Sequence, residues 1–278
     1  MNPFNLIKWS PLVVIYLYYK YNNNFNYKYY NDKTVLVTGG SSGIGKAIIN
    51  FLLKYTKAKI ITLARSFEDK ETDRIIYFKC DCSKYIDVLS VYNRINFNID
   101  TIIHCAGAGD WKFLNEMTID EVNRCLDAPL KSSIYVSYIF LESMKKRNSG
   151  NITFVQSPVI LQPWSSCTMY SVSRFGMKGL SESLRADLYK TNINITEVVL
   201  GRTSSNYFKT NITANSRFPI IGKLIREIKP KEAALAILWA IQKGKKYYYY
   251  PFMLRIIVYL NYLFPWLVRK LTFLTSFY

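Results

Sequence analysis

The sequence predicts an α/β protein with a doubly wound parallel sheet, covered by helices on both faces. From Thr34 onward, short β-rich runs alternate with helical runs, which is the order typical of an open parallel sheet. The first β-rich run leads directly into a glycine-rich turn. No internal repeat or second core is evident, so the 278 residues predict one domain with hydrophobic N- and C-terminal extensions.

The expected strands and helices alternate along the chain. The strands are Thr34–Thr38, Lys59–Leu63, Ile75–Lys79, Thr101–His104, Asn151–Val155 and Ile195–Leu200. The helices are Gly43–Tyr55, Ile86–Ile95, Ile119–Arg147, Tyr170–Tyr189 and Pro230–Gln242. Only Ser66–Arg74 separates the second strand from the third, which leaves room for about two helical turns. We therefore expect the α/β domain over residues 33–250, between end segments 1–32 and 251–278.

Composition excludes several classes of protein. Half of the residues are hydrophobic, which rules out a disordered or fibrous chain. Five cysteines without a repeated C-x-x-C support neither a disulfide framework nor a zinc site, so no metal is expected. His104 is the only histidine, and Ile102 and Ile103 beside it indicate a buried strand. A Ser-His-Asp or Cys-His mechanism would have to use that one residue.

A phosphate-binding turn follows the first strand. Residues 39–45 read Gly-Gly-Ser-Ser-Gly-Ile-Gly and open a helix. A strand, a glycine turn and a helix place backbone N–H groups and a helix N-terminus against a phosphate, as in a Rossmann-type sheet. The expected cofactor-binding residues of the turn are Gly39, Ser41, Ser42, Gly43, Ile44 and Gly45.

The end of the second strand bears on the choice of cofactor. The run Leu-Ala-Arg-Ser at residues 63–66 has no carboxylate where a site selective for NAD would bind the ribose 2′-hydroxyl. Arg65 could instead hold a 2′-phosphate, with hydroxyl donors from Ser41 and Ser42. The sequence thus predicts NADP as the cofactor, and an ordinary exposed arginine is the alternative for Arg65.

With this turn in place, the chain resembles the classical short-chain dehydrogenase/reductase family from about Lys33 to Tyr250. The TGxxxGxG turn is complete, and Ser157 precedes Tyr170 by thirteen residues, the family's spacing for its catalytic serine and tyrosine. The resemblance implies that Asp81 contacts the adenine ring. Cys-Ala-Gly at residues 105–107 resembles the family's Asn-Ala-Gly turn, which adds Ala106 and Gly107 to the cofactor-binding residues.

Two departures from the family pattern concern the chemistry. The family's Tyr-x-x-x-Lys ends in Arg174 here, and Pro129 stands where a helix normally supplies a catalytic asparagine. Arg174 can still place a cation one helical turn from Tyr170 and could reach the nicotinamide ribose. Arginine cannot act as a proton carrier, however. Pro129 would kink its helix and free a backbone carbonyl.

The resemblance implies reduction of a ketone by hydride transfer. Tyr170 would donate the proton, Ser157 would polarise the carbonyl and Arg174 would favour the phenolate. The glycine turn and hydrophobic ends resemble 3-ketosphinganine reductases, whereas the C-terminal tail is similar to membrane-associated dehydrogenase/reductase member 7 proteins. A hydrophobic ketone or alcohol, of the lipid, sphingoid or steroid kind, is therefore the expected substrate. The alternative is an NADP-binding protein with weak or no catalysis, because the usual asparagine and lysine are replaced.

Aromatic and apolar residues outside these motifs suggest where such a substrate could bind. Those that could line a lipid-sized pocket are Trp111, Phe113, Trp164, Met169 and Phe208, although ordinary core packing explains them equally well. The irregular segment 202–223 follows the last predicted strand and would suit a mobile lid.

Both ends of the chain predict association with a membrane. The apolar run 9–19 is too short to span, so an uncleaved anchor or interfacial helix is expected within residues 1–32. Half of the net charge of +18 lies in residues 216–278, beside an apolar tail. This combination suits a membrane surface better than nucleic acid, and residues 247–278 are expected to lie in the interface.

Location and assembly are expected as follows. Glycosylation acceptor sequences begin at Asn151, Asn194 and Asn211, and the first two fall on predicted core strands, which favours a catalytic domain that faces the cytosol. The expected location is the endoplasmic reticulum membrane. No nucleic-acid partner is expected, and a homodimer is left open.

Overall fold

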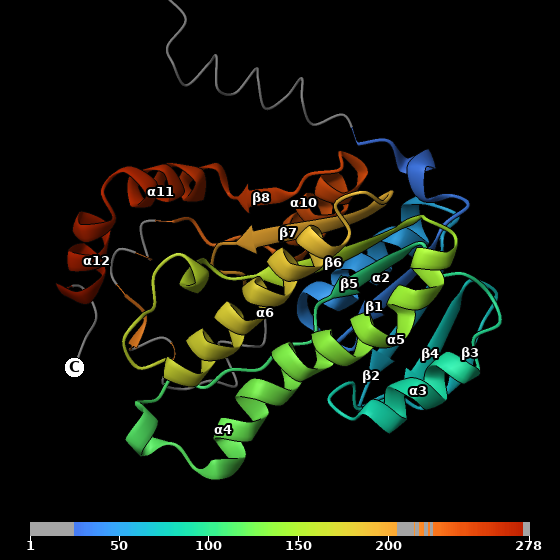
Figure 1. The fold of residues 1–278 in the computed structure, drawn as a ribbon, viewed down its shortest axis with the longest axis horizontal. Coiled ribbons are helices and arrows are strands. Elements are labelled where there is room, and N and C mark those ends of the chain that lie inside the picture. The colour runs from blue at the N-terminus through green and yellow to red at the C-terminus, as the bar shows by residue number, and fades with distance from the viewer. Residues whose placement is uncertain (1–24, 205–213, 215–216, 220–221, 223–224, 275–278) are drawn as a thin grey trace, which may run out of the picture.

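The described part of the chain, residues 25–204, 214, 217–219, 222 and 225–274 of the computed structural model, contains one eight-stranded sheet between two layers of helices (Figure 1). The strands are β1 Thr34–Thr38, β2 Lys59–Ala64, β3 Lys70–Glu71, β4 Ile75–Lys79, β5 Thr101–His104, β6 Gly150–Gln156, β7 Ile193–Leu200 and β8 Tyr247–Tyr250. Their order in the sheet is β3-β4-β2-β1-β5-β6-β7-β8. Every neighbouring pair is parallel except β3 with β4.

The helices divide between the two faces of this sheet. Their bounds are α2 Gly43–Tyr55, α3 Tyr85–Asn93, α4 Ile119–Leu126, α5 Ser132–Lys146, α6 Thr168–Asp187, α10 Pro230–Gln242, α11 Phe252–Leu263 and α12 Pro265–Leu274. Shorter turns are the 3-10 helices η2 Tyr27–Tyr30, η3 Leu114–Glu116 and η5 Pro158–Ile160 and the π turn η4 Asp127–Lys131. Apolar side chains of α2 and α10 form one core with the sheet, and those of α3, α5 and α6 form a second core on the opposite face. The predicted doubly wound fold is confirmed.

The strand order reverses at β1. Its two neighbours are β2 and β5, and the chain winds outward from them in opposite directions. The carboxyl ends of β1 and β5 therefore meet at a topological switch point, which is where open α/β sheets bind their ligands. The side chain of Thr38 joins the two ends, because its Oγ1 accepts hydrogen bonds from the backbone N–H of Cys105 and of Ala106, at 3.2 and 3.1 Å.

Two strands differ from the sequence-based expectation. Residues 66–74 leave room for about two helical turns, but the segment contains β3, which pairs antiparallel with β4. Residues 247–250 were expected to begin the interfacial segment, but they form β8 and pair in parallel with β7. Tyr248 is buried there beneath α10, so the sheet extends one strand further than predicted.

The helix predicted over residues 119–147 changes its winding at Pro129. It consists of α4, a π turn and α5. Proline has no backbone N–H and its ring clashes with the preceding turn, and a wider π turn accommodates both effects. Pro129 itself is buried, whereas Asp127 and Ala128 of the same turn line the cavity described below.

The single histidine lies in the core, as its apolar neighbours indicate. His104 is 2% exposed, and its Nε2 lies 3.0 Å from Oγ of Ser137 on α5. Within the described residues its Nδ1 has no hydrogen-bond partner. Burial lowers the pKa of this imidazole to about 3, so His104 is neutral at physiological pH.

The ends of the chain are described in part. Residues 1–24, which hold most of the predicted N-terminal anchor, lie outside the described residues. Residues 25–32 pack on the α/β domain: Tyr30 is fully buried, and its hydroxyl donates to the carbonyl of Leu238 on α10 at 2.7 Å. No described helix is long and apolar enough to cross a membrane alone. Only α11 and α12 taken together reach that length, and they are bent by 117°.

Candidate active site

A cavity of about 1260 Å³ opens at the switch point of the sheet. Every residue that the sequence assigned to the cofactor or to catalysis lines it: Gly39, Ser41, Ser42, Gly43, Ile44, Gly45, Arg65, Asp81, Ala106, Gly107, Ser157, Tyr170 and Arg174. They come from the carboxyl ends of β1, β2, β4, β5 and β6 and from α6. Residues far apart in the chain are therefore brought to one edge of the sheet, as parallel strands require.

The glycine turn leaves room for a ligand because its backbone is compact. Gly39 has φ +70°, and a Cβ there would lie 2.8 Å from the backbone of Ala106. A Cβ on Gly45 would lie 2.4 Å from the carbonyl oxygen of Gly39, so only glycine lets α2 pack this close to the turn. The N-terminus of the 13-residue helix α2 lines the cavity, which suits an anionic group.

Arg65 and Asp81, both predicted to bind the cofactor, line the cavity beyond the glycine turn. Arg65 follows β2 directly and is exposed, so its cation is accessible to a ligand in the cavity. Asp81 follows β4, and its Oδ1 accepts hydrogen bonds from the backbone N–H and the hydroxyl of Ser83, at 3.1 and 2.7 Å. These bonds hold the Asp81 side chain in one orientation at the cavity wall.

Arg174 lies directly against Tyr170. Both residues are on α6, and the guanidinium carbon is 5.0 Å from the centre of the Tyr170 ring. The guanidinium Nη1 donates to the carbonyl of Val155 at 2.9 Å, and a Cβ on Gly107 would lie 2.9 Å from Nη2. Arg174 is thus held between the end of β6, the turn after β5 and the tyrosine. The guanidinium therefore lies over the face of the Tyr170 ring.

Ser157 lies between β6 and the short helix η5, of which it is the N-cap residue. Its hydroxyl faces the backbone N–H of Val159 at 3.5 Å, a contact too long to be a strong hydrogen bond. Gln156, the residue before it, donates from Nε2 to the carbonyl of Arg174 at 3.2 Å. This bond ties the end of β6 to α6, so Ser157 and Tyr170 are held on elements that are joined to each other.

Cys105 stands where the resemblance expects an asparagine. Burial raises the pKa of this thiol to about 12, although the Arg174 cation opposes the rise. Cys105 is therefore a neutral thiol that packs beside the glycine turn.

Three aromatic rings form an apolar wall of the cavity. The ring centres of Trp111 and Trp164 are 5.7 Å apart, and Phe218 lies 5.4 and 5.1 Å from them. Phe113 and Met169, which the sequence also suggested as pocket residues, do not line the cavity. Phe208 lies outside the described residues. Phe218 was not identified from the sequence, because it follows an irregular segment whose path no motif predicts.

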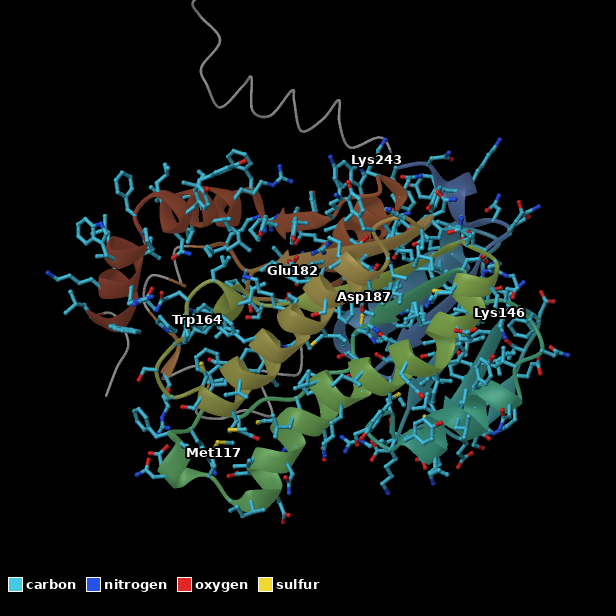
Figure 2. The ribbon with its side chains drawn as sticks, viewed as in Figure 1. Met117, Lys146, Trp164, Glu182, Asp187 and Lys243 are labelled. Atoms are coloured by element: carbon cyan, nitrogen blue, oxygen red, sulfur yellow. The ribbon has the colours of Figure 1, made fainter. Side chains whose placement is uncertain are left out.

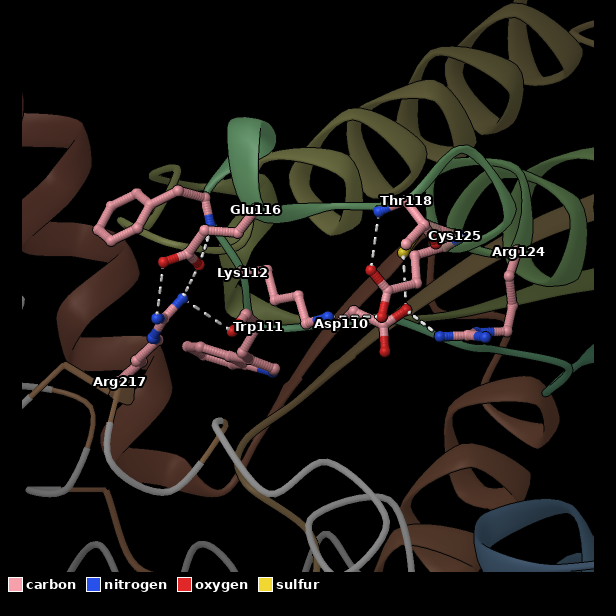
Figure 3. A network of polar contacts seen from close by, with 10 residues as sticks. Asp110, Trp111, Lys112, Glu116, Thr118, Arg124, Cys125 and Arg217 are labelled. Atoms are coloured by element: carbon pink, nitrogen blue, oxygen red, sulfur yellow. Dashed lines mark hydrogen bonds and ion pairs between the residues drawn. The ribbon is translucent and has the colours of Figure 1, made fainter.

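Ion pairs surround this wall (Figure 3). Arg217 pairs with Glu116 of η3, its Nη2 lying 3.0 Å from Oε1, and also donates to the carbonyl of Trp111 at 3.3 Å. Lys112 pairs with Glu121 at 2.6 Å, and Arg124 with Asp110 at 2.7 Å. These contacts fasten the segment after β5 to α4 and to residues 217 and 218. Most of the lid predicted over residues 202–223 lies outside the described residues.

The comparisons with known proteins agree with this fold. The family model for short chain dehydrogenases matches residues 33–216. The protein belongs to the short chain dehydrogenase family, whose members are oxidoreductases that act on ketone and alcohol groups with a nicotinamide cofactor.

Individual relatives are similar to this chain at moderate identity. The 3-ketodihydrosphingosine reductase of Mus musculus is 27% identical over 227 residues, which cover 73% of this chain and 67% of the mouse protein. A short chain dehydrogenase from Burkholderia cenocepacia, solved in complex with NADP, has a TM-score of 0.75 at 19% identity and covers 86% of this chain and 97% of its own. A family member from Burkholderia phymatum, solved in complex with NAD, has a TM-score of 0.73 at 15% identity, with 86% and 96% covered. These structures share the fold of this chain.

Proposed function

We propose that this protein is an NADP(H)-dependent reductase of a ketone on a hydrophobic substrate of the sphingoid type. The observation that carries the proposal is that Ser157, Tyr170 and Arg174 line the same cavity as the glycine turn and Arg65. The names of relatives such as the mouse 3-ketodihydrosphingosine reductase support the substrate class. The aromatic wall of Trp111, Trp164 and Phe218 would hold an alkyl chain.

The cavity fits a dinucleotide in size and in chemistry. The compact turn at Gly39 and the N-terminus of α2 would bind the pyrophosphate, and Arg65 would bind a 2′-phosphate. Asp81 would face the adenine ring. The reduced nicotinamide supplies the hydride in this chemistry.

The chain's own residues would then do three things. Ser157 would donate a hydrogen bond to the substrate carbonyl and polarise it. Tyr170 would transfer its phenolic proton to the oxygen that gains charge, and Arg174, 5.0 Å from the ring centre, would stabilise the phenolate that remains. Tyr170 is 8% exposed, so this proton transfer would occur in a site that largely excludes water.

The cellular setting follows from the same substrate class. A sphingoid ketone is confined to membranes, so the enzyme would work at a membrane surface, that of the endoplasmic reticulum, with its catalytic domain facing the cytosol. The charge excess supports an anionic membrane as the partner. A homodimer is compatible with this setting.

The test is turnover and NADPH affinity on the same detergent-solubilised, full-length preparations, with a panel of lipid ketones. Tyr170→Phe is expected to lower turnover by about 10²- to 10⁴-fold and to leave NADPH affinity nearly unchanged, because the lost hydroxyl serves the transition state. Arg174→Lys is expected to retain or raise turnover, because it keeps the cation and restores a proton route. Wild-type turnover that survives Tyr170→Phe would contradict the role of Tyr170.

A second candidate function is cofactor binding with weak or no catalysis. It is favoured by the hydrogen bond from Arg174 to the carbonyl of Val155, which engages the side chain that stands in for the family's lysine. The buried Pro129 at the π turn favours it too, since proline offers no side-chain hydrogen bond. A wild-type protein that binds NADPH but shows no Tyr170-dependent turnover with any lipid ketone would support this second function.

A further inference from the structure

The C-terminal helix pair, defined as α11 and α12, exposes an unusual amount of apolar surface. Several large side chains of the pair are more than 60% exposed: Tyr259, Tyr262, Leu263, Trp266 and Leu274. Figure 1 shows the pair at one end of the molecule, beyond β8. A soluble surface rarely keeps so many large apolar side chains in water, so this face indicates a contact with another apolar phase.

The charges of the pair all have one sign. Residues 251–278 contain Arg255, Arg269 and Lys270 and no aspartate or glutamate. Arg269 and Lys270 are exposed beside the apolar side chains. Tyrosine and tryptophan at the edge of an apolar face, with cations next to them, are the composition of a segment that lies in the headgroup region of an anionic bilayer.

The opposite side of the pair is fixed to the wall of the catalytic cavity. Leu254 of α11 is fully buried and packs in one apolar cluster with Trp111, Tyr170 and Phe218. Asn261 donates to the carbonyl of Leu161, in the segment between β6 and α6, at 3.5 Å. Figure 2 shows Trp164, which belongs to the same cluster, at the end of the molecule that carries α12.

We propose that the C-terminal helix pair lies in the plane of an anionic lipid bilayer and brings the aromatic wall of the cavity to the membrane, so that a hydrophobic ketone enters the site from the lipid. The helices have 12 and 10 residues and are bent by 117°, which suits the interface rather than a span. The entry of substrate by this route rests on the proposed function, whereas the contact with the bilayer does not.

A second copy of the chain would fit this face less well. In a two-fold contact the same patch meets itself, so Arg269 and Lys270 would face cations and no acidic side chain of the patch. An anionic bilayer matches the apolar residues and the cations at once.

The first test places Trp266 in the bilayer without any assay of activity. Full-length protein is mixed with vesicles of phosphatidylcholine and phosphatidylserine that carry brominated acyl chains, which quench tryptophan on contact. Trp266→Phe is expected to remove a distinct part of the quenching, while the control Trp239→Phe on α10 leaves that part in place. Quenching that is the same in wild type and in Trp266→Phe would overturn the proposal.

The second test concerns the charges. Arg269→Gln with Lys270→Gln is expected to weaken binding to vesicles that contain phosphatidylserine by about five-fold per charge, and to change binding to pure phosphatidylcholine little. The matched control is Lys145→Gln with Lys146→Gln at the end of α5, because Lys146 lies at the other end of the molecule (Figure 2). If the two double variants lose the same amount of vesicle affinity, the position of the positive charges on the protein does not matter, which contradicts the proposed orientation.

The third test concerns entry of the substrate. Leu263→Ser with Trp266→Ser is expected to raise KM for a ketone held in vesicles, while NADPH affinity and turnover of a short, water-soluble ketone stay unchanged. If wild type turns over no ketone but Trp266 is quenched, the proposed function fails and the bilayer contact stands. If Trp266 is not quenched and the double variant converts a dimer into a monomer, the face is an interface between copies, and the proposal is wrong.

Discussion

Arg65 is the residue on which the choice between NADPH and NADH depends. It follows β2, is exposed and lines the cavity, and residues 63–66 contain no carboxylate. Arg65→Ala is expected to weaken NADPH binding by about 10- to 100-fold, because a charge-assisted hydrogen bond contributes about 1.5–3 kcal/mol. Titration of both cofactors into the same variant measures this, with NADH as the internal control. Equal losses for the two cofactors would exclude a contact with the 2′-phosphate.

His104 makes the stability of the fold depend on pH. Burial holds its pKa at about 3, whereas an unfolded histidine titrates near 6.5. The unfolded state therefore binds one more proton between these values, and the free energy of unfolding falls as the pH falls below about 6.5, by up to about 1.4 kcal/mol per pH unit. His104→Gln cannot bind this proton and is expected to flatten the slope. Denaturant titrations from pH 5 to pH 8 measure it, and an unchanged slope in the variant would assign it to other groups.

The cavity shows which residues sequence reasoning can find. Its motif residues were predictable because strand ends and a thirteen-residue spacing bring them to one edge of the sheet. Arg202 and Phe218 line the same cavity but follow β7 in an irregular segment, where spacing predicts no position. The hydrogen bond from Arg174 to the carbonyl of Val155 could not be predicted from the sequence either, because the rotamer of Arg174 depends on the packing between β6 and α6.

At the scale of elements, the ion pair between Glu116 of η3 and Arg217 adjoins the aromatic wall. Glu116 holds Arg217, and Arg217 precedes Phe218 and donates to Trp111. Glu116→Gln is expected to raise KM for the ketone by about two- to five-fold and to leave NADPH affinity unchanged. An exposed ion pair contributes little to the stability of the fold, so its loss would mainly alter the position of Arg217 and of the neighbouring Phe218. The control is Glu142→Gln, which breaks the exposed pair of Glu142 with Lys146 on α5, neither of which lines the cavity. A larger effect on NADPH affinity than on KM would contradict this assignment.

The elements missed by the sequence have physical reasons. The run of four tyrosines in β8 shows no alternation of apolar and polar residues, and it adjoins an apolar tail, so it was grouped with that tail. The two residues of β3 are too few to produce a pattern. The change of winding at Pro129 could be foreseen as a kink, but its form as a π turn depends on tertiary packing, here of α4 and of the turn itself against α6.

At the scale of the whole molecule, the glycine turn and most of the aromatic wall belong to opposite halves of the sheet. The glycine turn follows β1, whereas Trp164, Phe218 and the C-terminal helix pair follow β6, β7 and β8. The reversal of strand order at β1 and β5 joins the two halves in one cavity. We therefore expect changes in the aromatic wall to alter KM for the ketone and to leave NADPH affinity unchanged.

The direct connection of β8 to α11 has a kinetic consequence. Only Pro251 lies between the last strand and the first helix of the pair, so the sheet has no linker on which to turn relative to a surface that holds the pair. An enzyme held this way would encounter its substrate by diffusion in the plane of the membrane, and its cavity would stay at a constant height above the lipid. Its rate would then follow the mole fraction of ketone in the membrane, and diluting the vesicles in more buffer at a constant lipid composition would leave the turnover of each bound molecule unchanged.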